Sequence, residues 1–117
     1  MNLAEIKQPI LARIGDSLNP ILFGFNNEDD THIDISTWDF AISIRNKENQ
    51  EVALFTMETG LSIINDAGVS KLLWSFPLEI DIVEGKHKFY VKYYNGGDGY
   101  QTILQGDFIV ECKKVEL

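Results

Sequence analysis

Period-two alternation of apolar and polar side chains is the feature that most constrains the fold of this chain. In the stretch IDISTWDFAISIR (residues 33–45), large apolar side chains fall on every second position: Trp38, Phe40, Ile42 and Ile44. The stretch KHKFYVKYY (residues 86–94) repeats the pattern, with lysines and two tyrosines on one side. Such alternation is typical of β-strands that bury one face, because successive side chains of a strand point to opposite sides of the sheet. A further alternating run, YQTILQGDFIVECKK (residues 100–114), contains Gly106. A glycine inside a strand predicts a β-bulge at that position.

Turn-forming residues separate these runs. NKENQ (residues 46–50), DAG (66–68) and NGGDG (95–99) each lie between two alternating runs, which indicates β-hairpins. PLEIDIVEG (77–85) has a proline and a glycine in the places where they could begin and end a helical turn. We therefore predict an all-β fold, an antiparallel β-sandwich of about seven or eight strands, in a single domain that spans residues 1–117.

Five short motifs follow one another in an order that points to a family. They are GDS (residues 15–17), IDISTWDFAISIR (33–45), LSIINDAG (61–68), VEGKHKFYVKYY (83–94) and DGYQTILQGDFIVE (98–111). Together they resemble the immunoglobulin-like domain of phage tail and baseplate proteins, typified by the N-terminal domain of baseplate upper proteins. The resemblance covers about residues 15–111 and depends on the order and spacing of the motifs. It implies an immunoglobulin-like sandwich and a non-enzymatic structural protein of a phage or prophage virion, assembled in the host bacterial cytoplasm.

The turn that precedes Trp38 is expected to be architectural. Asp34 or Ser36 can accept hydrogen bonds from the backbone of the turn, and Trp38 is expected to enter the core as the first inward residue of its strand. The family usually has Thr-Gly where Ser36 and Thr37 stand, so the turn does not depend on glycine here. The family also tends to have tyrosine where His87 stands, which leaves open whether a tyrosine-type corner hydrogen bond forms.

Four aromatic side chains make up the candidate interaction surface: Trp74, Tyr90, Tyr94 and Tyr100. Exposed aromatic rings can anchor a protein interface or stack on sugar rings. They can also pack across strands, or against lysine stems, on the outer face of a sheet. We expect assembly with other virion proteins and with copies of this chain, in a tail, baseplate or neck. A carbohydrate-binding module, with a glycan on these aromatic rings, is the alternative function.

Charge and cysteine content exclude several classes of partner and chemistry. The net charge of −8, from 18 acidic and 10 basic residues, repels phosphate backbones, so we expect no nucleic acid partner. The sequence has no run of 18 apolar residues, so we predict no membrane span. A nucleophilic thiol at Cys112 would need His32 or His87 as its base, and no catalytic motif accompanies them. We therefore expect no enzyme and no cofactor.

A few carboxylates are candidate metal ligands. Asp29, Asp30 and Asp34 could together ligate calcium, and so could Asp98 with backbone carbonyls of its turn. Neither stretch has the spacing of a known calcium loop, and the two histidines have no zinc-site spacing. We expect these carboxylates to lie in solvated turns and predict no metal site.

Overall fold

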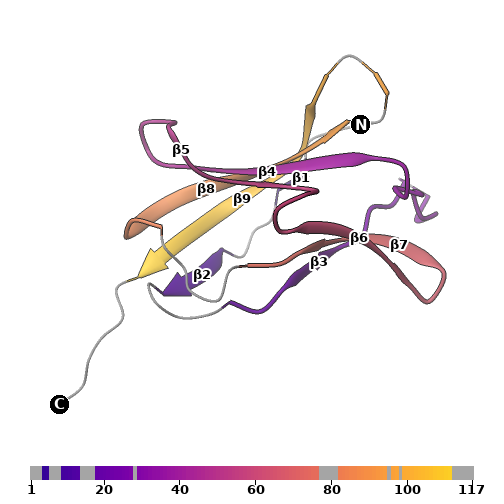
Figure 1. The fold of residues 1–117 in the computed structure, drawn as a ribbon, viewed down its shortest axis with the longest axis horizontal. Helices are drawn as coiled ribbons and strands as arrows, with labels where there is room; N and C mark the ends of the chain where they lie inside the picture. The colour runs from indigo at the N-terminus through magenta and orange to yellow at the C-terminus, as the bar shows by residue number, and fades with distance from the viewer. Residues whose placement is uncertain are drawn as a thin grey trace.

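The chain folds into two β-sheets that pack face to face (Figure 1). The computed structural model describes residues 4–5, 9–13, 18–27, 29–76, 82–94, 96–97 and 99–111. The larger sheet has six strands: β1 (Ala4–Glu5), β2 (Ile10–Arg13), β4 (Asp39–Arg45), β5 (Glu51–Thr56), β8 (Gly85–Tyr94) and β9 (Gln101–Glu111). The smaller sheet has three strands: β3 (Ile21–Phe23), β6 (Leu61–Asp66) and β7 (Val69–Trp74).

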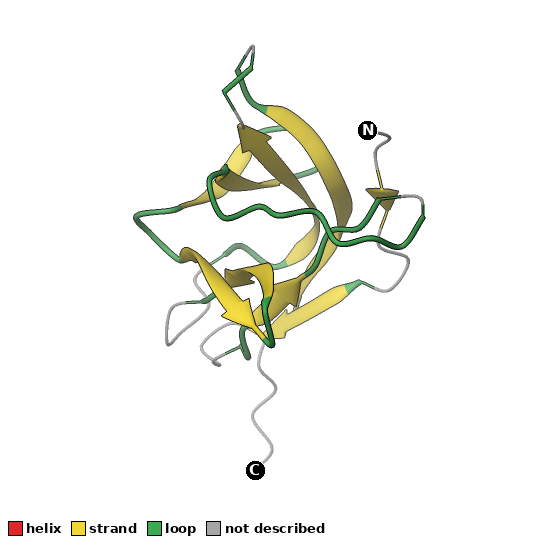
Figure 2. Cartoon of the chain, turned by 90° about the vertical axis from the view of Figure 1, so that its right-hand side faces the viewer, coloured by secondary structure: helices red, strands yellow, loops and turns green. Residues whose placement is uncertain are grey.

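Every regular element in the described part of the chain is a strand, and Figure 2 shows these strands joined by loops. The predicted all-β sandwich is thereby confirmed. The described residues form nine strands in place of the predicted seven or eight, and one of the nine, β1, is only two residues long.

The strand order distributes successive hairpins between the two sheets. In the larger sheet the order is β1-β9-β8-β4-β5, and β2 also pairs with β9; in the smaller sheet it is β3-β7-β6. The chain therefore crosses between the sheets after β2, β3, β5 and β7. The pairings of β1 and β2 with β9 are parallel, whereas the other pairings between strands are antiparallel.

The predicted hairpins are confirmed. Between β4 and β5, the Asn46 side chain accepts hydrogen bonds from the backbone N–H groups of Glu48 and Gln50, at 3.1 and 2.9 Å. Between β6 and β7, Ala67 and Gly68 both have positive φ, 53° and 84°, as a two-residue type I′ turn requires. β8 and β9 also pair as a hairpin, although residues 95 and 98 of its turn lie outside the described residues.

The predicted bulge at Gly106 was wrong, because Gly106 lies in regular register opposite Phe89. The irregularity lies at Ile103. Val91 pairs with Leu104, and the next residue, Lys92, pairs with Thr102. Ile103 therefore has no pairing partner on β8. Ile103 and Leu104 are consecutive and both buried, which a regular strand with one buried face does not allow.

Trp74 lies at the centre of the core between the sheets. Its ring meets five other aromatic rings at centroid separations of 4.6 to 6.4 Å: Phe23, Phe55, Phe76, Phe89 and Phe108. Phe40, Ile42 and Ile44 of β4 are fully buried, which confirms the alternation seen in the sequence. A one-residue slip of β4 would carry all three side chains to the surface, so their burial fixes the register of the larger sheet.

His87, the third residue of β8, forms a hydrogen bond with the segment that precedes this strand. A helical turn is predicted over residues 77–85; residues 77–81 lie outside the described residues, and residues 82–84 are not helical. His87 is buried, and its Nε2 lies 2.6 Å from the carbonyl oxygen of Val83. Because a carbonyl oxygen only accepts, Nε2 carries the proton and donates it. Immunoglobulin sandwiches can have a tyrosine near the start of this strand that bonds upstream backbone in the same way. A hydrogen bond from β8 to the upstream backbone therefore forms, with the histidine ring as its donor in place of a tyrosine hydroxyl.

Candidate functional site

Tyr90 and Tyr94 lie on the outer face of the larger sheet. In β8 the buried side chains of Phe89, Val91 and Tyr93 alternate with these two, which point away from the core. Tyr90 is half-buried, and Tyr94 is 38% exposed. Four residues along one strand separate the two tyrosines by roughly 13 Å on the same face. The sequence prediction of surface tyrosines on this strand is therefore met.

Tyr94 and Tyr100 come together at the end of the β8–β9 hairpin. Their ring centroids are 5.8 Å apart with the ring planes inclined by 41°, and Tyr100 is 50% exposed. Asp39, the first residue of β4, pairs with Tyr94 across the sheet. The Tyr100 hydroxyl donates a hydrogen bond to Oδ2 of Asp39. We call Asp39, Tyr94 and Tyr100 the tyrosine cluster.

The Asp39 carboxylate changes the acidity of Tyr100. The hydrogen bond from the phenol to Asp39 raises the pKa of Tyr100 above its ordinary value of 10.0. Partial desolvation and the negative charge of Asp39 act in the same direction. Because the folded-state pKa is raised, this hydrogen bond stabilises the fold fully below the ordinary tyrosine pKa. Its contribution is lost as pH rises through the raised pKa.

An alkaline titration followed by tyrosinate absorbance tests this assignment. The chain has four tyrosines, and we expect one of them to ionise at higher pH than it does in the Asp39→Asn variant. Tyr100→Phe should remove the same late phase, because it deletes the phenol but keeps the ring. A late phase that persists in both variants would show that Tyr100 is not its source.

The predicted placement of Trp74 on the interaction surface was wrong. Trp74 has no exposed surface and lies inside the sandwich. Leu72 and Trp74 point inward from β7, the central strand of the smaller sheet, which pairs with β3 on one side and β6 on the other. Of the four candidate residues, Tyr90, Tyr94 and Tyr100 therefore remain as a candidate interaction surface.

Hydrogen bonds accepted by Asp34 stabilise the turn before β4. Oδ1 of Asp34 accepts the backbone N–H of Ser36 at 3.0 Å and the hydroxyl of Ser70 at 3.2 Å. These bonds, led by the Ser36 backbone N–H, lower the pKa of Asp34. The prediction that Asp34 accepts a hydrogen bond from the backbone of the turn is confirmed, and the backbone of Ser36 is the donor. Trp38 was expected to enter the core. It is half-buried, and its ring stacks on that of Tyr93 with the centroids 4.8 Å apart, so it packs at the margin of the core.

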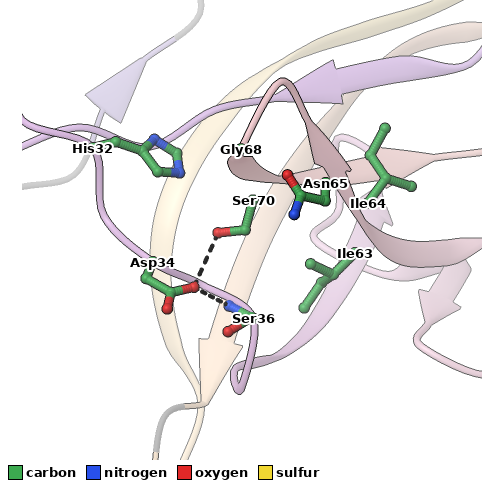
Figure 3. Close-up of a pocket in the computed structure, with 8 residues that line it drawn as sticks. All are labelled: His32, Asp34, Ser36, Ile63, Ile64, Asn65, Gly68 and Ser70. Carbon is green, nitrogen blue, oxygen red and sulfur yellow. Dashed lines mark hydrogen bonds between the residues drawn. The ribbon is translucent and has the colours of Figure 1, made fainter.

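A pocket of about 520 Å³ lies beside this turn (Figure 3). Its lining combines polar side chains with two isoleucines: His32, Asp34, Ser36, Ile63, Ile64, Asn65, Gly68 and Ser70. Serine, histidine and aspartate all face it, but the Ser70 hydroxyl donates directly to Asp34. Nδ1 of His32 lies 3.4 Å from Oδ1 of Asn26. A catalytic relay needs the histidine between serine and aspartate, so these contacts do not form one.

Of the other candidate ligands, Asp29 serves local structure, Asp30 is exposed, and Asp98 lies outside the described residues. Asp29 accepts hydrogen bonds from the hydroxyl and backbone N–H of Thr31, which lower its pKa. Among the described residues, no three His, Cys, Asp or Glu side chains gather as a metal-binding group. Residues 15–17, Asp98 and Cys112 lie outside the described residues. In the same described ranges, no helix has the length and apolar character needed to cross a membrane.

Asp39 is the residue of the site that sequence reasoning missed. Alternation places it on the polar side of its strand, opposite to Trp38 and Phe40. Its meeting with Tyr100, however, depends on the pairing of β4 with β8, which no local pattern gives. Comparison of the whole chain with protein-family models and with curated proteins finds no match.

Proposed function

We propose that this chain is a non-enzymatic structural protein of a phage or prophage virion that works by protein–protein assembly in a tail, baseplate or neck. The observation that carries the assembly role is the pair of exposed rings, Tyr94 and Tyr100, held against a carboxylate on an outer sheet face. Tyrosine is enriched where protein surfaces meet. The virion role depends on the resemblance of the ordered motifs, because a β-sandwich by itself hosts many functions.

The same sheet face offers apolar contact area in the row of Tyr90. Leu54 of β5 is 51% exposed and pairs with Ser43 of β4, which pairs in turn with Tyr90 of β8. Ser43 is buried in this row and donates to Glu51 at 2.8 Å, so its hydroxyl is already satisfied. Burial of Leu54 and the tyrosine rings against a neighbouring protein would supply affinity, at roughly 25 cal/mol for each Å² of apolar surface removed from water.

Incorporation into particles tests this function. We expect the chain at a fixed stoichiometry in virions or tails purified from a producing host, measured by quantitative mass spectrometry. A Tyr94→Ser/Tyr100→Ser double variant should fold, as judged by circular dichroism, but be depleted from the particles about tenfold or more. Tyrosine is enriched among the few interface residues that carry most of the binding energy, and a loss of about 1.4 kcal/mol is tenfold in affinity.

Leu22→Ser is the matched control, because Leu22 is 41% exposed on the other sheet and lies far from the tyrosine cluster in the strand order. It should be incorporated like the natural chain. Absence of the chain from particles would contradict the virion role. Equal incorporation of the double variant would contradict the use of this face. Sedimentation at rising concentration tests the proposed self-association, which a strictly monomeric chain would contradict. Glycan-array binding that the double variant loses would favour the carbohydrate-binding alternative.

A further inference from the structure

Asp39 is a half-buried carboxylate without a cationic partner in the described part of the chain. The ion pairs found there join Arg13 to Glu111 and Lys71 to Asp66. Lys92 occupies the next outward position on β8 but forms no ion pair with Asp39. Carboxylates that are removed from water are usually paired with a cation or coordinate one. Asp39 therefore carries a negative charge that no described side chain of this chain neutralises.

The rings beside Asp39 are arranged to receive a cation. A carboxylate offers about four acceptor positions, and the hydrogen bond from the Tyr100 hydroxyl occupies one. Within the described residues, no other side chain or backbone N–H donates to the Asp39 carboxylate. Tyr100 contacts the carboxylate through its hydroxyl, and the ring of Tyr94, the cross-strand partner of Asp39, lies 5.8 Å from the Tyr100 ring. Both tyrosines are exposed, and aromatic faces attract cations placed over them.

We propose that the tyrosine cluster binds an arginine side chain of a partner protein, with the guanidinium on the Asp39 carboxylate and against a tyrosine ring. This inference rests on the proposed assembly function and names the chemistry of its contact. Arginine fits better than lysine because its planar guanidinium can stack on an aromatic face and also present two parallel N–H donors to a carboxylate. An opposite charge placed beside Asp39 offsets part of the cost of its partial burial.

Titration with a single amino acid derivative tests the contact without an identified partner. N-acetyl-arginine amide is added to the isotope-labelled chain at constant ionic strength, and aromatic NMR signals are followed. We expect saturable shifts in the Tyr94 and Tyr100 resonances. N-acetyl-citrulline amide, which has nearly the same shape but no charge, should shift them little, and N-acetyl-lysine amide should bind more weakly than the arginine derivative.

Two carboxylate variants separate a specific contact from general attraction to an acidic protein. Asp39→Asn should weaken binding of the arginine derivative about tenfold or more, which is the loss of one charge-assisted contact. Asp107→Asn is the control, because Asp107 is an exposed carboxylate on the same face, opposite Lys88. This variant should bind the derivative like the natural chain. Equal weakening in both variants, equal shifts with citrulline, or no shift at all would overturn the inference.

The outcomes separate this inference from the function on which it rests. If Asp39→Asn is incorporated into particles as well as the natural chain, the arginine contact fails and the virion role survives. If the chain is absent from particles but binds the arginine derivative through Asp39, the virion role fails and the cation site stands.

Discussion

Replacing Trp74 with alanine is expected to lower the free energy of unfolding by about 4 kcal/mol, the largest effect of any substitution considered for this chain. The indole is fully buried and contacts aromatic rings from both sheets, including Phe23 of the smaller sheet and Phe89 and Phe108 of the larger one. Alanine would leave a cavity that neither sheet can close alone. Because domains of this size are stable by only about 5–15 kcal/mol, much of the total would be lost.

Urea denaturation followed by circular dichroism measures this loss. Trp74→Phe should cost much less than alanine, because it keeps most of the aromatic contact. It also removes Nε1, a buried donor that has no hydrogen-bond partner among the described residues. Tyr94→Ala is the surface control and should cost less than about 1 kcal/mol. A Trp74→Ala variant that is as stable as Tyr94→Ala would contradict the central position of this ring.

The second large effect is expected at His87. His87→Ala should lower the free energy of unfolding by about 2–3 kcal/mol, because it empties a buried position and removes the donor to the Val83 carbonyl. For a domain of this length, that corresponds to a fall in melting temperature of roughly 10 °C.

His87→Phe separates the ring from its hydrogen bond. Phenylalanine fills the position and loses the bond from Nε2, which is worth about 1 kcal/mol. It also removes Nδ1, which is buried without a hydrogen-bond partner among the described residues, and this offsets part of the loss. We therefore expect a variant within about 1 kcal/mol of the natural chain. If thermal unfolding shows phenylalanine and alanine to be equally destabilising, the corner hydrogen bond is the larger contribution and the packing argument is wrong.

The elements that sequence predicts well are those that local chemistry decides. Phe40, Ile42 and Ile44 alternate strictly, so the buried face of β4 follows from the pattern alone. The turn at Ala67 and Gly68 follows from residues that tolerate positive φ between two apolar runs. Both features depend on neighbours within a few positions along the chain.

The features that sequence predicts poorly depend on pairing between distant segments. Leu72, Leu73 and Trp74 are three apolar residues in a row, so alternation cannot say which of them face inward. Leu72 and Trp74 face inward because β7 is the central strand of the smaller sheet and this side of it packs against the larger sheet. The bulge at Ile103 and the contact of Asp39 with Tyr100 likewise depend on how β8 pairs with its two neighbours. The phage resemblance stays a prediction, and particle incorporation is the measurement that decides it.

The parallel pairing of β2 with β9 has a consequence for how the chain reaches this structure. Ile10 pairs with Phe108, so the contact joins segments from nearly opposite ends of the sequence. Closing so long a loop is entropically costly, and pairings of this kind form slowly. During synthesis, β2 must wait without its sheet partner until β9 has left the ribosome. The β4–β5 and β6–β7 hairpins can form earlier, so β2 is expected to join its sheet after them.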